Sequence, residues 1–281
     1  MTSRGLIAAI LLLLCADAAS AQQRPLTTED PESIGAGRVL FEGGLDYAHD
    51  VDYTVSGLTG NLTSVPTLGL SIGISSIAEI QIDGGLYNHL AITGMKPAPL
   101  SSLLTVTGDS THDISDIVIG TKIRLAPEGD KRPSFGFRFV TKLPNARNET
   151  GLGLDTTDFY ASVLIAKTIR SLRIVGNIGS GILGDPTNGQ RQNDVVTYGF
   201  SLARAVTERA ELVGEVNGRV NLRSEGPLPG SETRGLVKFG GRFTRGPVRF
   251  DAAAFFGLTE IDPTFGFTTG ITYVFNAFTV P

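Results

Sequence analysis

The feature that most constrains this 281-residue chain is an alternation of apolar and polar residues that recurs from residue 37 onward. Leu68, Leu70 and Ile72 are separated by Gly69 and Ser71, and similar alternation returns around 135–139 and 237–240. Successive side chains of a β-strand point to opposite faces, whereas a helix repeats its apolar residues every three or four positions. The pattern therefore predicts strands with one apolar and one polar face, and we find no long helical stripe.

The alternation divides the chain into about twelve segments, most of them long enough for a tilted strand to cross a bilayer, which takes about 9–11 residues. Short and long connections between them alternate, as in a transmembrane barrel with tight periplasmic turns and longer outer loops. We therefore predict an all-β, antiparallel, up-and-down transmembrane β-barrel, with a secreted sandwich as the alternative. The predicted strands are 37–48, 66–75, 78–91, 114–126, 133–142, 157–168, 171–182, 195–205, 209–219, 233–243, 247–257 and 264–275.

The N-terminal region has the pattern of an export signal. Arg4 precedes an apolar run over 5–14, and Ala19 and Ala21 form a small-x-small cleavage site, which predicts a cleaved signal peptide over 1–21. Residues 22–36 are polar and contain Pro25 and Pro31, so we expect a flexible periplasmic tail there, followed by the barrel over 37–281.

Composition narrows the possible functions. Cys15 is the only cysteine, and it lies within the expected signal peptide, so a disulfide scaffold or cysteine metal site is not expected. The net charge is only −4 and no block of like charge occurs, which argues against nucleic acid as a partner. We expect no cofactor, and we expect a protein of the outer membrane of a Gram-negative bacterium whose main partner is the lipid bilayer.

The last strand carries a pattern of its own. Thr268, Gly270, Tyr273 and Phe275 resemble the C-terminal signal of bacterial outer-membrane proteins, although six residues follow Phe275 here. This resemblance implies that the barrel-assembly machinery reads the segment.

A second resemblance covers about half of the mature chain. The strand with Gly120 and Lys122, the turn Lys142-Leu143-Pro144 and the glycine-rich loop that ends at Asp158 are similar to a group of small outer-membrane barrels. That group is the transporter-like family named for the MetA pathway of phenol degradation. The resemblance implies an exported barrel and a small, hydrophobic or aromatic solute.

The polar strand faces should line the barrel lumen, and they carry many of the charges. Acidic residues gather in the early strands and basic residues in the middle and late strands. These charges either set an electric field across a narrow pore or pair with one another and fill the interior, and a twelve-stranded barrel is compatible with both. The candidate lumen-lining residues are Glu42, Asp46, Glu79, Asp83, Asp116, Lys122, Arg124, Arg138, Lys142, Arg173, Glu211, Glu215, Arg219, Arg234, Lys238, Arg242, Arg249 and Asp251.

Three functional hypotheses follow. The first is a passive channel for a small solute. The second is a structural or surface-interaction barrel with an occluded lumen, in which the long loop 92–113 does the work. The third, a membrane-embedded hydrolase, has little support, because His49, His89 and His112 are scattered and match no metal-site spacing. We therefore expect no catalytic residue.

Overall fold

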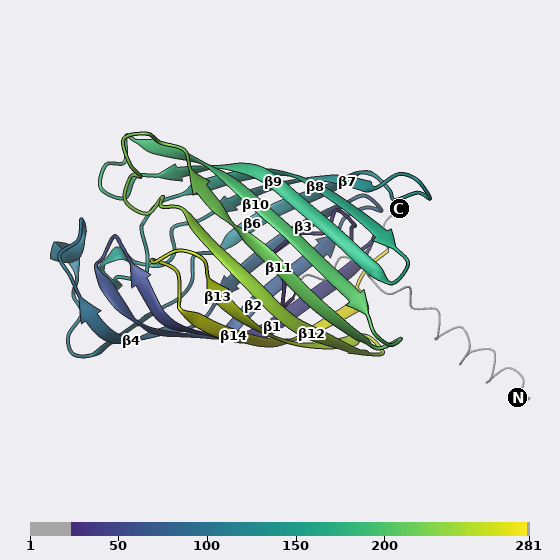
Figure 1. The fold of residues 1–281 in the computed structure, drawn as a ribbon, viewed down its shortest axis with the longest axis horizontal. Coiled ribbons are helices and arrows are strands. Elements are labelled where there is room, and N and C mark those ends of the chain that lie inside the picture. Colours follow the sequence, from purple (N-terminus) through teal and green to yellow (C-terminus); the bar gives the residue numbers. More distant parts are fainter. Residues whose placement is uncertain (1–23, 280–281) are drawn as a thin grey trace, which may run out of the picture.

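The computed structural model describes residues 24–279, which form one closed antiparallel barrel (Figure 1). Its strands are β1 (Arg38–Tyr53), β2 (Leu58–Gly73), β3 (Ala78–Gly85), β4 (Asn88–Met95), β5 (Ser110–Asp113), β6 (Val118–Ala126), β7 (Ser134–Lys142), β8 (Asp158–Ile169), β9 (Leu172–Gly184), β10 (Gln192–Ala205), β11 (Ala210–Asn221), β12 (Arg234–Arg245), β13 (Val248–Gly257) and β14 (Phe265–Asn276). From β6 to β14 each strand pairs with its neighbours in the chain, and β1 pairs with β14 to close the wall.

The fourteen strands fill twelve positions around the barrel, which confirms the predicted fold. β3 and β4 both pair with β2, one with its C-terminal half and one with its N-terminal half, so they share a position in the wall. β5 pairs with β4, and β6 pairs with β3, so β5 and β6 also share one position in the wall. The predicted strand 78–91 is therefore interrupted after Gly85, and the predicted strand 114–126 begins only at Val118.

The outer face of the wall is apolar, as the alternation predicts. On β14 the side chains of Phe267, Ile271 and Phe275 are exposed, whereas those of Thr268 and Thr272 point inward and are buried. A surface that faces hydrocarbon gains nothing from polar groups, and closure of the wall lets its backbone N–H and C=O groups pair between neighbouring strands.

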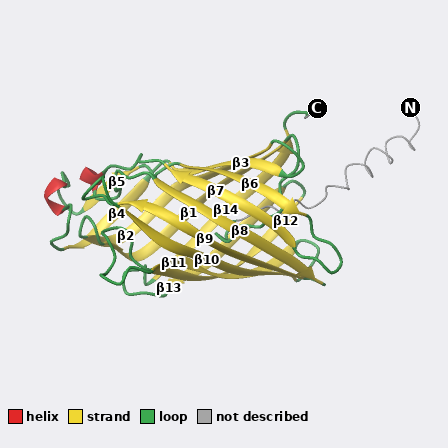
Figure 2. Cartoon of the chain, turned by 90° about the horizontal axis from the view of Figure 1, so that it is seen from above, coloured by secondary structure: helices red, strands yellow, loops and turns green. Residues whose placement is uncertain are grey.

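Tight turns lie at one end of the barrel and longer connections at the other (Figure 2). The connection predicted over 49–65 is shorter than expected, because β1 and β2 extend to leave only residues 54–57 as a turn. The loop predicted over 92–113 shrinks to 96–109 for the same reason and contains the 3-10 helix η1 (Ser101–Leu103), while η2 (Asn148–Thr150) lies in the loop after β7. No helix among residues 24–279 is long and apolar enough to cross a membrane.

The segment before β1 differs from its prediction. We expected residues 22–36 to be a loose periplasmic tail, but residues 24–36 lie inside the barrel, and Glu29 and Ile34 are almost completely buried. The expectation failed because a short polar segment with two prolines has no local pattern that reveals distant partners. The expected signal peptide over 1–21 lies outside the described residues.

Candidate functional site

Residues 24–36, here called the plug segment, cross the lumen and hydrogen-bond to strands on opposite sides of it. The backbone N–H groups of Thr27 and Thr28 donate to the carboxylate of Glu215 on β11, at 2.9 and 2.8 Å. The N–H of Ile34 donates to Glu79 on β3 at 2.7 Å. A segment without regular structure must satisfy its buried backbone groups through side chains, and inward carboxylates meet this need here.

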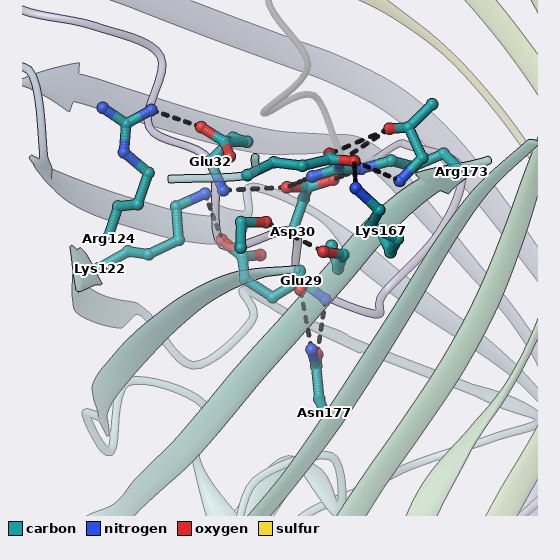
Figure 3. A network of polar contacts seen from close by, with 12 residues as sticks. Glu29, Asp30, Glu32, Lys122, Arg124, Lys167, Arg173 and Asn177 are labelled. Atoms are coloured by element: carbon teal, nitrogen blue, oxygen red, sulfur yellow. Dashed lines mark hydrogen bonds and ion pairs between the residues drawn. The ribbon is translucent and has the colours of Figure 1, made fainter. Parts of the chain in front are cut away.

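The centre of the plug segment is a buried ionic cluster around Glu29 (Figure 3). A Glu29 carboxylate oxygen lies 3.1 Å from Nζ of Lys122 on β6, and the same Nζ lies 3.0 Å from Glu79. The backbone of Glu29 exchanges two hydrogen bonds with the amide of Asn177 on β9, at 2.7 and 2.8 Å. These contacts connect the plug segment to two walls of the barrel at one residue.

Asp30 and Glu32 extend this network toward the end with the tight turns. Asp30 accepts two hydrogen bonds from the guanidinium of Arg173, at 2.8 and 2.7 Å, and Glu32 pairs with Arg124. Arg173 also contacts Glu128, in the turn between β6 and β7. Partial burial raises the pKa of Glu128, but the Thr168 N–H and the nearby lysine and arginine outweigh it and hold that pKa below its usual value.

The first residue of the plug segment is held by the opposite wall. The Arg24 guanidinium donates to Thr268 on β14 at 2.8 Å and lies 3.6 Å from both Asp46 and Asp251. The carbonyl oxygen of Arg24 accepts a hydrogen bond from Arg242, and that of Pro25 accepts one from Lys238. The contacts of the plug segment therefore run around the full circumference of the barrel.

Most of the residues predicted to line the lumen contact this segment, and a few do not. Those that contact it are Glu42, Asp46, Glu79, Lys122, Arg124, Arg138, Arg173, Glu215, Lys238, Arg242 and Asp251. The rest lie elsewhere along the wall: Asp83 beside Arg138, Asp116 and Lys142 paired near the outer end, Glu211 beside Arg242, Arg249 against Thr244, and Arg219 and Arg234 at a cavity described below.

The sequence reasoning missed the inner half of these pairs, namely Arg24, Glu29, Asp30 and Glu32. It offered two outcomes for the inward charges, a field across a pore or pairing between walls. In the structure many of them pair between strands of the wall, as Glu79 does with Lys122 and Glu215 with Lys238, and most also contact an inserted segment that was not expected. The available signal was the unusual density of charges in residues 24–32, just before the first strand.

Between the plug segment and the outer end lies an inner cavity of about 700 Å³. Thr27 and Thr28 border it; Thr27 also borders a cavity of about 350 Å³ and Thr28 one of about 120 Å³. The plug segment therefore narrows the lumen and has cavities along several of its sides.

An outer cavity of about 250 Å³ adjoins the inner one. Tyr160, Arg219 and Arg234 line both cavities, and Gly151 and Gly230, from the outer loops, border the outer one. The loop over 96–109 packs against the turn between β1 and β2, where the Leu100 N–H donates to the carbonyl of Val55. The two cavities are lined by other segments of the chain.

The three histidines lie away from these cavities. His49 packs its ring against Phe265 at a centroid distance of 4.9 Å, and His89 is the register partner of His112 at the β4–β5 hairpin. Within residues 24–279 no group of side chains has the arrangement of a metal site.

No protein-family model matches the sequence, and no curated protein matches it significantly. Among solved structures, the COG4313 outer membrane channel from Pseudomonas putida F1 is similar, with a TM-score of 0.63 and 13% identity over 88% of this chain and 98% of that chain. The NalP autotransporter translocator domain from Neisseria meningitidis (TM-score 0.48, 12% identity, 96% and 95% covered) and the TodX deltaS2S3 mutant monoaromatic hydrocarbon channel (0.42, 13%, 88% and 93%) match more weakly. At these identities the comparison shows a shared barrel fold.

Proposed function

We propose that this protein is a passive channel of the Gram-negative outer membrane for a small solute, and that the plug segment closes it. The observation that carries the proposal is the row of cavities along the lumen, interrupted by a segment of the same chain. Support for the membrane setting comes from the apolar outer wall and from the fold shared with an outer membrane channel. The tight turns then face the periplasm and the longer loops face outward.

The chemistry of the plug segment suits a reversible closure. Its contacts with the wall are mainly ion pairs and hydrogen bonds, which water can replace once the segment leaves the lumen. Its firm apolar contact is at one end, where Ile34 packs with Leu40 and Val274. Gly35 and Gly37 follow with φ of 93° and 70°, conformations that favour glycine, so the chain turns between this contact and β1.

Planar-bilayer recording of a variant that lacks residues 24–33 tests the proposal. We expect the full chain to conduct weakly and intermittently and the deletion variant to conduct continuously with a larger step. A deletion of residues 101–106, in the loop over 96–109, serves as the matched control and should behave like the full chain.

The alternative is a structural or surface-interaction barrel whose lumen never opens, and the buried ionic cluster around Glu29 is the observation that favours it. A folded deletion variant, recognised by heat-modifiable migration on gels, that shows neither conductance nor solute flux into liposomes would establish this alternative.

We also propose that Thr268, Gly270, Tyr273 and Phe275 act as the assembly signal. In support, all four lie on the closing strand β14, where Tyr273 and Phe275 stack on the outer surface at 5.5 Å.

A further inference from the structure

Two arginines stand side by side where the inner and outer cavities meet. Arg219 on β11 and Arg234 on β12 are direct register partners, and both side chains line the cavities. Like charges directly opposite each other on neighbouring strands destabilise a sheet. A pair of this kind in a lumen therefore calls for a compensating interaction.

The hydrogen bonds that the two guanidinium groups donate to backbone carbonyls orient them without neutralising their charge. Arg219 donates to the carbonyls of Glu232 and Gly230, at 3.0 and 2.8 Å. Arg234 donates to the carbonyls of Ile261 and Asp52, both at 2.9 Å. Each guanidinium has five N–H donors, so each retains donors for a further partner.

One nearby carboxylate pairs with Arg234, and a second lines the outer cavity. Asp262 presents Oδ1 to Arg234 at 3.9 Å, while its Oδ2 accepts hydrogen bonds from the backbone of Gly235 and from Thr259. Glu232 accepts from Thr54 and from its own loop through Oε1, and its buried Oε2 has no hydrogen-bond partner among residues 24–279. Among residues 24–279, no carboxylate lies within 4.0 Å of the Arg219 guanidinium.

An apolar patch lies next to the arginine pair, although the interior of a membrane barrel is usually polar. Phe255, Val51 and Ala48 are buried together on the inward face, and Leu62 and Leu236 pack against them. All five residues line the inner cavity. Leu236 is two residues from Arg234 on the same face of β12, a separation of about 7 Å along the strand.

Two glycines keep the aromatic rings flat against the wall. A Cβ at Gly266 would lie 2.1 Å from the ring of Phe255, and one at Gly181 would lie 2.7 Å from the ring of Tyr160. Both rings therefore occupy the space that a side chain would fill. This arrangement leaves the cavity open and turns apolar surface toward it.

From these observations we propose that the inner cavity binds a small carboxylate with a flat apolar body. The carboxylate accepts hydrogen bonds from Arg219 and Arg234, a geometry to which guanidinium groups are well suited. The apolar body rests on Leu236 and Phe255. This inference rests on the proposed channel function and names the class of solute that the channel admits.

Equilibrium dialysis against the folded full chain in detergent tests this site with three probes. Benzoate has both parts of the proposed ligand, benzyl alcohol lacks the charge, and acetate lacks the apolar body. We expect benzoate to bind about tenfold more tightly than either of the others, as one charge-assisted hydrogen bond and one buried ring each contribute about that much. Equal binding of benzoate and benzyl alcohol, or of benzoate and acetate, overturns the proposal.

Variants locate the binding. Arg219→Gln should weaken benzoate binding about tenfold and leave benzyl alcohol unchanged, whereas Arg245→Gln, at the exposed far end of β12, should change neither. If folded Arg219→Gln binds benzoate as tightly as the unaltered protein, Arg219 does not hold the carboxylate. If that variant fails to fold, the comparison of the three probes on the unaltered protein decides whether the cavity binds an aromatic carboxylate. If the full chain binds benzoate but the plug-deletion variant does not conduct, the proposed channel function is wrong and the binding site stands. If the plug-deletion variant conducts but the full chain does not bind benzoate, the channel function stands and the binding site is wrong.

Discussion

The carboxylate of Glu29 lies 3.1 Å from the ammonium group of Lys122, and both side chains are at most 3% exposed inside the barrel. Lys122 belongs to the wall and Glu29 to the plug segment, so this pair joins the two. Burying charges is costly unless they are paired, and Lys122 has a second partner in Glu79 at 3.0 Å. The Glu29–Lys122 pair is therefore one of several contacts that hold the plug segment against the wall.

Glu29→Gln should shift the plug segment toward its released state. Because Glu79 still pairs with Lys122, we expect a loss of about 1.5 kcal/mol, which corresponds to a rise of about tenfold in the ratio of open to closed channels. Single-channel recording measures this ratio directly. Glu225→Gln, in a loop where the exposed carboxylate contacts Arg223, is the matched control. Equal open fractions for the two variants would show that Glu29 does not hold the plug segment.

A disulfide should lock the plug segment in place. A Cβ built at Gly199 on β10 lies 3.5 Å from Cβ of Thr28, within the range of about 3.5–4.5 Å found in disulfides. The double variant Thr28→Cys, Gly199→Cys should conduct less when oxidised and recover on reduction with dithiothreitol. The single variant Thr28→Cys should not respond to dithiothreitol. If the oxidised double variant conducts as well as its reduced form, release of the plug segment is not what opens the channel.

A side chain at Gly136 should prevent the plug segment from docking while leaving the barrel intact. A Cβ at this position would lie 2.9 Å from Cβ of the buried Pro31. Gly136→Val should therefore increase both continuous conductance and hydrogen exchange in residues 24–34. Gly214→Val is a suitable comparison, because its Cβ would meet no residue of the plug segment within 3.4 Å and would lie 3.4 Å from the Phe239 ring and 3.6 Å from the Lys238 carbonyl oxygen. A closed Gly136→Val channel with normal protection would contradict the docking described here.

Replacing the aromatic residues of the closing strand should impair assembly. The double variant Tyr273→Ser, Phe275→Ser is expected to reduce the folded, heat-modifiable protein in outer-membrane fractions several-fold. Phe250→Ser removes a similarly exposed aromatic side chain from β13 and controls for the loss of apolar surface alone. Equal losses in the two variants would mean that position on the last strand has no special role.

Local pattern was sufficient to predict the wall. Each strand shows its alternation within ten or so residues, and a face that meets lipid tolerates few departures from it, so β7 to β14 lie close to their predicted ranges. The errors fall where the wall is irregular, at the interruption between β3 and β4 and at the unexpectedly long β1 and β2. The strands β1 and β2 continue past the residues whose regular alternation of apolar and polar side chains was used to predict them.

The sequence by itself determined an all-β chain with an apolar outer face and a charged inner face, because both properties repeat every second residue. Only the tertiary structure decided what the inner charges do. Glu29 meets Lys122 and Asn177, and Thr28 meets Glu215, across roughly 90 to 190 residues of chain. Contacts over such separations leave no periodic trace, since they depend on closure of the barrel to bring the plug segment and the wall together.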